Sequence, residues 1–340
     1  MRLTRGEALK LFTDGDLLEL GKTANAICKK KFGDMTTFII DRNINYTNVC
    51  KNECKFCAFF RRKNQRGAYL LTHEEILQKV RETVEAGGTQ LMIQGGLHPD
   101  LDLNYYTEML RLIKKNFDIT IHSFTATEIQ HFANCAGLSI LETLKRLQAA
   151  GLDSLPGGGA EILVDDIRKK ISPKKIMTDD WLNVMKLAHS IGMKSTATMV
   201  IGFGETLAQR LEHMEKIRNL QDETGGFRAF ITWTYQPKNT ALGGEKVSAH
   251  DYMKTLAMTR IFMDNVDHIQ GSWVTQGERI GQLTLAFGAD DLGSIMLEEN
   301  VVRAAGTSFE MSTRKMIDLI RSAGKTPAQR NTKYEVLKTF

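Results

Sequence analysis

The stretch NVCKNECKFC (48–57) follows an apolar segment, TFIIDRNI (37–44), and is the densest group of reactive side chains in the sequence. It contains three of the five cysteines of the chain: Cys50, Cys54 and Cys57. Their spacing is C-x3-C-x2-C, with the aromatic Phe56 before the last one, while Cys28 and Cys135 stand alone. An odd number of cysteines with one tight cluster indicates metal or redox chemistry rather than disulfide bonds.

Outward from this stretch, β-like and helix-like segments alternate along the chain. Such alternation predicts parallel strands joined by right-handed crossovers, and eight such units close as a (β/α)8 TIM-type barrel of the α/β class. The expected strands are 37–44, 89–96, 119–125, 152–158, 196–203, 228–235, 268–274 and a short one near 287–293. Functional residues of a barrel gather after the strand C-termini, which is where the cysteine cluster lies.

Helix start signals separate these strands, and no Pro/Ser-rich linker divides the chain. Three candidate capping boxes open helices: Thr72 with Glu75, Ser139 with Glu142, and Thr206 with Gln209. We therefore predict a single barrel domain over residues 1–340. It consists of a helical lead-in (1–36), the barrel (37–310) and a C-terminal helical tail (311–340).

Composition narrows the class of protein. The chain has 340 residues, 42% of them hydrophobic and 25% charged, as in an ordinary globular protein. No stretch approaches the ~20 uninterrupted apolar residues of a membrane span, and the first residues lack the apolar core of a secretory signal. The net charge of +5 is spread along the chain, which is weak support for anionic ligands and none for nucleic acid. We expect a cytoplasmic protein without membrane or nucleic-acid partners.

Three thiolates on one short loop can hold three corners of a 4Fe-4S cluster and leave the fourth iron without a protein ligand. A structural zinc usually takes four ligands, often as two separated pairs, and no fourth suitable residue lies nearby. Two other readings stay open: a zinc knuckle, and buried structural thiols.

The motif, together with its place after the first barrel strand, resembles the radical S-adenosylmethionine (SAM) superfamily. This resemblance implies a 4Fe-4S cluster on Cys50, Cys54 and Cys57, whose open iron binds SAM. It also implies that an electron from a flavodoxin or ferredoxin cleaves SAM to a 5′-deoxyadenosyl radical. The basic run at 61–66 is a candidate docking site for that donor, and a solvated loop is its alternative.

The resemblance extends to further loops after strands, and it implies contacts to SAM there. The glycine pair after the second strand would approach the methionine amino group, and an acidic residue after the fourth strand would bind the ribose. The fifth strand would pack against the adenine, and a nearby arginine would face the carboxylate. The residues in these roles are Gly95 and Gly96, Glu161, Ile201 and Phe203, and Arg168. Plain turns, a helix-terminal charge and core packing are the alternatives.

Within the superfamily, the chain resembles the subgroup that holds the two radical enzymes of the futalosine route to menaquinone and the enzymes that assemble the deazaflavin chromophore. Runs in the C-terminal third, SWVTQG (272–277), GADDLGS (288–294) and TPAQRNT (326–332), are similar to the dehypoxanthine futalosine cyclases. The sister aminofutalosine synthases and the deazaflavin enzymes remain alternatives, and the Asp290-Asp291 pair leans slightly toward the sister family.

The cyclase resemblance implies an oxidoreductase whose substrate is dehypoxanthine futalosine, a ribose that carries a benzoate through a ketone tether. The 5′-deoxyadenosyl radical would remove the ribose C4′ hydrogen, and the carbon radical would add to the benzoate ring. Loss of one electron and one proton would then restore the aromatic ring.

The last step needs a base, and Asp290 or Asp291, expected at the barrel mouth after the eighth strand, is the candidate. A turn or helix-cap role is equally compatible with the sequence. Five residues at strand C-termini are candidates for the sugar hydroxyls or the ketone, with packing as their alternative: Tyr46, Thr47, His98, Thr234 and Gln276. The benzoate carboxylate needs an arginine or backbone amides, and the sequence leaves Arg168, Arg279 and loop amides open.

Two readings from another class are a metal-binding scaffold without enzymatic activity and an ordinary barrel enzyme with structural cysteines. The scaffold predicts zinc rather than iron, and the ordinary enzyme predicts activity that needs no SAM.

Overall fold

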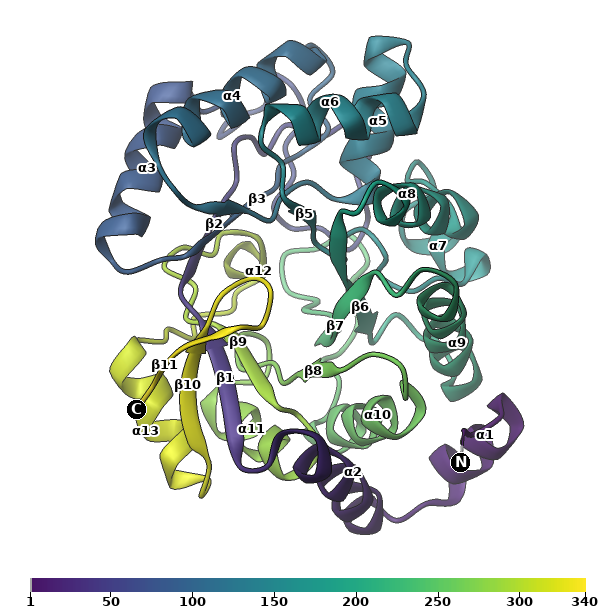
Figure 1. Ribbon diagram of the computed structural model, residues 1–340. Helices are drawn as coiled ribbons and strands as arrows, with labels where there is room; N and C mark the ends of the chain where they lie inside the picture. Colours follow the sequence, from purple (N-terminus) through teal and green to yellow (C-terminus); the bar gives the residue numbers. More distant parts are fainter. Residues whose placement is uncertain (1) are drawn as a thin grey trace.

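Eight parallel strands form a ring with helices around it, as expected (Figure 1). The structure is a computed structural model that describes residues 2–340. The strands of the ring are β1 and β2 (Met35–Ile39 and Asp41–Ile44, two halves of one strand), β3 (Gln90–Ile93), β4 (Thr120–Ile121), β5 (Ser154–Leu155), β6 (Lys194–Ile201), β7 (Phe227–Thr234), β8 (His268–Gln270) and β9 (Asp291–Ser294). The barrel fold that the sequence predicts is therefore confirmed.

The split first strand joins two sheets into the ring. Its first half, β1, pairs with β9, and its second half, β2, pairs with β3. A bridge between His122 and Ser154 connects β4 to β5 and completes the circuit. The other side of β1 is occupied by a strand from the C-terminus, β10 (Thr326–Arg330), which runs parallel to it.

The C-terminal tail differs from the all-helical segment that was expected over 311–340. It begins with helix α13 (Thr313–Ser322) but continues as β10 and β11 (Val336–Thr339), which pair antiparallel. The reason is that Gly324, at φ 72°, ends the helical turn and the chain then extends along the free edge of β1.

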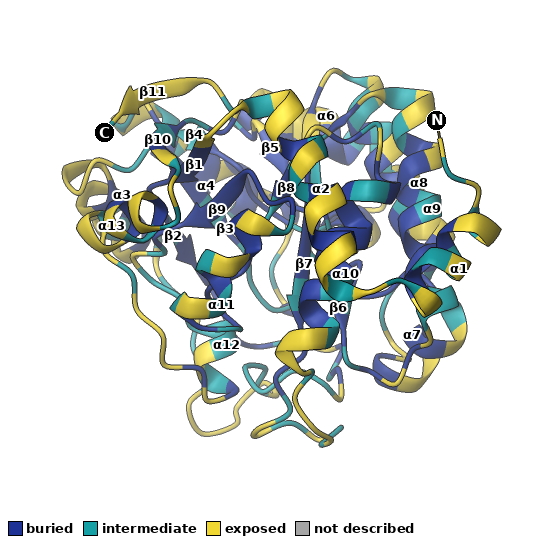
Figure 2. Cartoon of the chain, turned by 90° about the horizontal axis from the view of Figure 1, so that it is seen from below, coloured by how far each residue is buried: buried dark blue, intermediate teal, exposed yellow. Residues whose placement is uncertain are grey.

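Most of the other helices cover the outside of the ring: α1 (Arg5–Asp14), α2 (Leu17–Phe32), α3 (His73–Glu85), α4 (Leu103–Asn116), α5 (Ala126–Ala136), α6 (Ile140–Ala150), α7 (Asp165–Ile171), α8 (Thr178–Ser190), α9 (Leu207–Thr224), α10 (Ala249–Phe262) and α11 (Glu278–Leu283). The short helix α12 (Val301–Ala304) instead lies over the cavity, which Val301 and Val302 line. Figure 2 shows buried residues on the strands and on the inner faces of these helices. Among residues 2–340, none of the helices is both long and apolar enough to cross a membrane.

Two of the three expected capping boxes form. Thr72 with Glu75 and Thr206 with Gln209 exchange hydrogen bonds at the starts of α3 and α9. At α6, Ser139 accepts from the backbone N–H three residues on, but no bond returns.

Alternate residues of each strand face opposite sides of the ring. In β6, Thr196, Thr198 and Val200 line the interior, whereas Met199 and Ile201 are fully buried toward the helices. This alternation decides which residues can reach a ligand inside the barrel.

Candidate active site

A cavity of about 400 Å³ lies inside the barrel and has the cysteine loop in its wall. Cys50, Cys54 and Cys57 all line it, as do residues from the strands around the ring. Glycine-rich segments at 94–97 and 156–159 also line it. The structure therefore brings the cysteines and two of the predicted glycine loops to one space.

Backbone and side-chain hydrogen bonds hold the cysteine loop in place. Cys50 N donates to Arg61 O at 3.0 Å, and Arg61 N donates to Asn48 O at 2.7 Å. The Asn48 side chain bonds the backbone of Gly67 and Tyr69 at 2.8 and 2.9 Å. Hydrogen bonds within residues 48–69 therefore fix the conformation of the loop, and the three cysteines line the cavity.

Burial raises the pKa of the Cys54 thiol to about 12 and also raises the pKa of Cys57. A metal bound to a thiol deprotonates it, so iron would reverse this shift. Within residues 2–340, no three His, Cys, Asp or Glu side chains converge on one point as ligands of a single metal ion. A 4Fe-4S cluster does not need such convergence, because each cysteine binds a different iron.

The glycine pair after β3 packs directly against the cysteine loop. A Cβ at Gly95 would lie 2.5 Å from the ring of Tyr46, and one at Gly96 would lie 2.2 Å from Val49 O and 2.9 Å from Cys50 Cβ. Any side chain there would displace the loop that carries the cysteines. Both glycines line the cavity, but their N–H groups donate to Glu128 Oε1 and Thr47 O, and Gly96 O accepts from His98 N. Among the described residues, Gly95 O is therefore the backbone group left for a ligand next to the cysteines.

Glu161 lines the cavity, and one of its carboxylate oxygens, Oε2, lies 3.8 Å from Arg168 Nη1 without a hydrogen bond. Its Oε1 accepts from Lys175 Nζ at 2.7 Å, while its Oε2 is buried and has no hydrogen-bond partner among the described residues. A buried carboxylate oxygen without a donor is costly. A sugar hydroxyl or another donor at this position would satisfy it, so the residues present fit a SAM molecule with its ribose at Glu161.

Arg168 is not part of the cavity, which contradicts the role expected for it. The side chain is fully buried, and its guanidinium is used by backbone carbonyls of the loop after β5 and of the segment after α7. The acceptors are Gly159 O, Ala160 O, Ile162 O and Ile176 O. Arg168 therefore braces the loop that carries Glu161 and has no guanidinium face for a ligand carboxylate.

The expected adenine contacts also need correction. Ile201 is fully buried on the helix side of β6, because Val200 takes the cavity side. Phe203 does not line the cavity either. Its ring packs at 5.4 Å against the ring of Phe56, which does line it, and at 5.0 Å against Tyr235.

None of the five residues expected to bind substrate lines the cavity. Tyr46 donates its hydroxyl to Glu128 Oε1 at 2.8 Å, and Thr47 donates to Tyr69 O at 2.5 Å. Both brace the start of the cysteine loop. Tyr46 follows Asn45, which takes the cavity side, and therefore points to the other face.

Gln276, Thr234 and His98 also make hydrogen bonds within the protein and do not line the cavity. Gln276 donates to Thr234 Oγ1 at 2.6 Å, so these two side chains satisfy each other. His98 Nδ1 accepts from Asp100 N at 3.2 Å in the loop after β3. All five residues lie at or after strand C-termini, as expected, but their side chains do not line the cavity.

The aspartates proposed as the base are not at the barrel mouth. β9 begins at Asp291, so both carboxylates lie at the N-terminal end of that strand. Asp290 is buried and pairs with Arg260 and with His268 Nδ1, the latter at 2.6 Å. Asp291 accepts from Arg330 Nε at 2.6 Å and does not line the cavity. Ion pairs inside the protein occupy both carboxylates.

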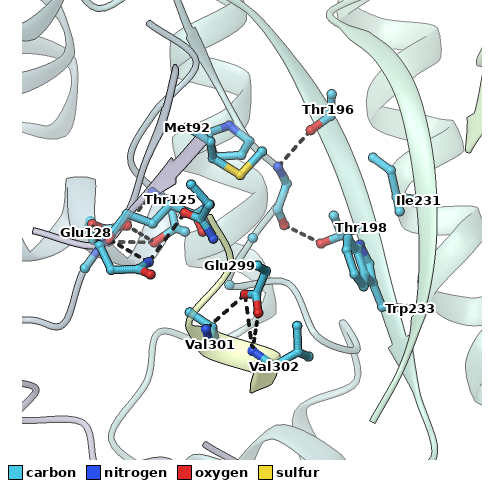
Figure 3. Close-up of a pocket in the computed structure, with 18 of the residues that line it drawn as sticks. Met92, Thr125, Glu128, Thr196, Thr198, Ile231, Trp233, Glu299, Val301 and Val302 are labelled. Carbon is cyan, nitrogen blue, oxygen red and sulfur yellow. Dashed lines mark hydrogen bonds between the residues drawn. The ribbon is translucent and has the colours of Figure 1, made fainter. Parts of the chain in front are cut away.

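Sequence reasoning missed the polar residues that face the cavity from the strands themselves. They are Asp41, Asn43, Asn45, Gln90, Gln94, His122, Thr196, Thr198 and Gln270. Figure 3 shows Met92, Thr196, Thr198 and Trp233 around the space. The signal was available in the run DRNIN (41–45), where the polar residues Asp41, Asn43 and Asn45 stand at every second position.

The C-terminal tail supplies another part of the wall. Arg330, Thr332 and Tyr334 line the cavity, and the Arg330 guanidinium lies 3.8 Å from the centre of the Tyr334 ring. Arg279 does not line the cavity and is exposed. Among the described residues, Arg330 is thus the one arginine that lines the cavity, and it forms an ion pair with Asp291.

Two family models match the chain. The model described as the radical SAM superfamily covers residues 44–217, and that described as the CofH/MqnC C-terminal region covers residues 224–340. Together they span the cysteine loop, strands β3 to β9, and the tail that bears Arg330.

Curated relatives match over nearly the whole chain. Two are named cyclic dehypoxanthine futalosine synthase. The protein of Streptomyces coelicolor is 49% identical over 99% of this chain and 86% of its own length, and that of Halalkalibacterium halodurans is 47% identical over 100% and 92%. A 5-amino-6-(D-ribitylamino)uracil–L-tyrosine 4-hydroxyphenyl transferase of Archaeoglobus fulgidus is 41% identical over 94% of each chain. The solved structure of methylornithine synthase has the same fold, with a TM-score of 0.77 at 19% identity over 96% of this chain and 95% of that one.

Proposed function

The chain belongs to the radical SAM superfamily, in its CofH/MqnC branch, and on this premise we propose that it cyclises dehypoxanthine futalosine to cyclic dehypoxanthine futalosine in menaquinone biosynthesis. The observation that carries the proposal is the identity of 47% and 49% to two relatives of that name, over almost the full length of each. The transferase of Archaeoglobus fulgidus, which has a different name, is less similar, at 41%.

We propose that Cys50, Cys54 and Cys57 hold a 4Fe-4S cluster, and that Gly95, Gly96 and Glu161 contact SAM. Once held by these residues, the cluster and SAM would supply 5′-deoxyadenosyl radical chemistry for hydrogen removal at the ribose C4′ and bond formation to the benzoate ring. The unpartnered Glu161 Oε2 supports the ribose contact. We propose that Val200, which takes the cavity side of β6, packs against the adenine in place of Ile201, and that Phe203 acts indirectly by packing against Phe56 in the cavity wall.

The barrel would hold the two reacting carbons together and keep other hydrogen donors away. Three side chains of the cavity wall carry a buried oxygen that has no partner within residues 2–340, and we propose these residues for the hydroxyl and ketone groups of the substrate: Asn45 (Oδ1), Thr127 (Oγ1) and Thr332 (Oγ1). Trp233, on β7, also lines the cavity, and its ring suits the flat benzoate.

The electron donor, a flavodoxin or ferredoxin, would dock beside the cysteine loop. Of the basic run there, Arg61 Nη1 donates to backbone carbonyls of the loop, such as Phe60 O at 2.8 Å, and is structural. Arg62 pairs with Glu53 at 2.7 Å, at the exposed surface. We propose that Arg62 and Arg66 contribute to the docking surface for this electron donor. We also propose that the whole chain forms a single barrel domain.

The test uses the protein reconstituted with iron and sulfide under anaerobic conditions, with dithionite and SAM. We expect 5′-deoxyadenosine and the cyclised product to form together when dehypoxanthine futalosine is added. Product from the aminofutalosine substrate, or from tyrosine with the ribitylaminouracil, in place of the cyclised product would identify one of the alternative enzymes. Zinc instead of iron in the protein would refute the radical chemistry as a whole.

A further inference from the structure

The cyclisation needs a group that takes a proton from the substrate ring, and the two aspartates that the sequence offered are occupied elsewhere. We propose that His122 Nε2 accepts this proton. The inference rests on the proposed cyclase function and names the base of its last step.

His122 presents one ring nitrogen to the cavity and anchors the other. Nδ1 lies 2.6 Å from Ser154 Oγ, and Ser154 is fully buried. Nε2 makes no hydrogen bond within residues 2–340, and it is not sealed away from the cavity that the residue lines. When Nδ1–H donates to Ser154, Nε2 carries a free lone pair that faces the cavity.

The position of His122 along the barrel suits the substrate ring. His122 N donates to Leu91 O at 2.9 Å, so the residue lies level with Met92 on β3. Gln94 and the glycine pair follow on β3 toward the cysteine loop. A substrate with its ribose beside the cysteines would therefore extend its benzoate toward this level.

Two carboxylates of the cavity wall are already saturated. Glu128 accepts four hydrogen bonds, from Tyr46 Oη, Gly95 N, Thr125 N and Thr125 Oγ1, at 2.7 to 2.9 Å. Glu299 caps α12 and accepts from three successive backbone N–H groups, two of which, on Val301 and Val302, are drawn in Figure 3. Neither has a lone pair positioned for the substrate.

The remaining titratable groups do not serve as acceptors either. Asp41 accepts from Gln90 Nε2 at 2.6 Å and bonds Ser294, and burial raises its pKa. Burial also raises the pKa of Tyr334, so its phenol keeps its proton. Glu161 pairs with Lys175 at the cysteine end. His122 is left as the neutral base with an open nitrogen.

Neutrality matters for the chemistry. Burial, with help from Arg228 and Arg330, lowers the pKa of His122 to about 3, so the ring is unprotonated before the reaction. A neutral imidazole with its N–H bonded to Ser154 offers the substrate radical an acceptor and no acidic proton. A weak base suffices once the excess electron has left, because the resulting cyclohexadienyl cation regains aromaticity on proton loss and is strongly acidic.

The proton and the excess electron of the cyclised radical go to different acceptors. In the cyclised radical the C–H bond at the new ring junction breaks, and its electron pair enters the π system. The proton goes to Nε2, and the single excess electron goes to a one-electron acceptor of the iron–sulfur class. The products are the aromatic cyclised compound, an imidazolium and the reduced acceptor.

The experiment compares 5′-deoxyadenosine with cyclised product in the reconstituted enzyme, in the wild type and in His122→Gln. We expect substrate-dependent 5′-deoxyadenosine to stay within about threefold of the wild type, because hydrogen abstraction precedes the base. Product per 5′-deoxyadenosine should fall by about tenfold or more. An unchanged ratio would overturn the proposal.

His189→Gln is the matched control, because His189 is a largely buried, Ser/Thr-bonded histidine outside the cavity. Its product ratio should equal that of the wild type. If His122→Gln makes no 5′-deoxyadenosine, Ser154→Ala decides: the imidazole stays but its tautomer is no longer fixed, so the product ratio should fall, and an unchanged ratio refutes the role. A wild type that makes 5′-deoxyadenosine but no cyclised product would instead refute the proposed function.

Discussion

Replacing Arg168 by methionine tests whether a buried arginine braces the loop that bears Glu161. The guanidinium makes five hydrogen bonds to four backbone carbonyls, at distances that include 2.6 Å to Ile176 O and 3.1 Å to Gly159 O. Methionine is of similar length but donates no hydrogen bond, so the carbonyls lose their partner. Each unsatisfied carbonyl costs about 1–3 kcal/mol, and the arginine's own desolvation is no longer required. We expect a net loss of about 3–5 kcal/mol in the free energy of unfolding.

Urea unfolding followed by circular dichroism measures this loss, and anaerobic calorimetry with SAM measures its functional consequence. Because the loop carries Glu161, SAM affinity should weaken by about tenfold or more. The control is Arg146→Met, which removes an exposed pair with Glu142 and should cost no more than about 0.5 kcal/mol. A loss below about 1 kcal/mol in Arg168→Met, with normal SAM affinity, would refute the bracing role.

Three further predictions follow from single contacts. Gly96→Ala places a Cβ 2.2 Å from Val49 O, so iron bound per chain after reconstitution should drop, while Gly6→Ala, which has no atom within 4 Å, should bind iron normally. Glu161→Gln should weaken SAM binding by about 10- to 100-fold in calorimetry with iron content unchanged, and equal affinity would contradict the ribose contact. Burial lowers the pKa of His213 to about 3, so the unfolded chain takes up a proton there below about pH 6.5 and the folded chain does not. His213 should therefore remove about 1.4 kcal/mol of stability per pH unit as the pH falls from 6.5 toward 3, and His213→Gln should show a correspondingly shallower slope in urea unfolding.

The sequence was sufficient for the order of elements because each strand is short, apolar and bounded by helix signals. It was also sufficient to bring the cysteines and glycine loops together, since parallel strands end on the same side of a barrel. The C-terminal strands were missed because their pairing with β1 is a contact between opposite ends of the chain, which local patterns do not encode.

The errors within the site have a different cause. Thr234 and Ile201 were chosen because they end strands, but which face a residue occupies depends on the register of the whole ring. The polar alternation of Asp41, Asn43 and Asn45 carried that register and pointed to the cavity side. Asp290 was placed at the mouth because the last strand was set too early by a few residues.

The position of β10 beside β1 has a consequence for how substrate choice can be exchanged among such proteins. The cysteine loop and the glycine pair Gly95 and Gly96 belong to residues 44–217, whereas Arg330, Thr332 and Tyr334 line the cavity from the last segment of the chain. A chimera that takes residues 224–340 from a relative would thus have different residues in this part of the cavity wall, while it keeps the cysteine loop and the rest of residues 44–217. Such a chimera has to preserve the parallel pairing of Met35–Phe38 with 326–329, because this pairing attaches the exchanged C-terminal segment to the first strand of the barrel.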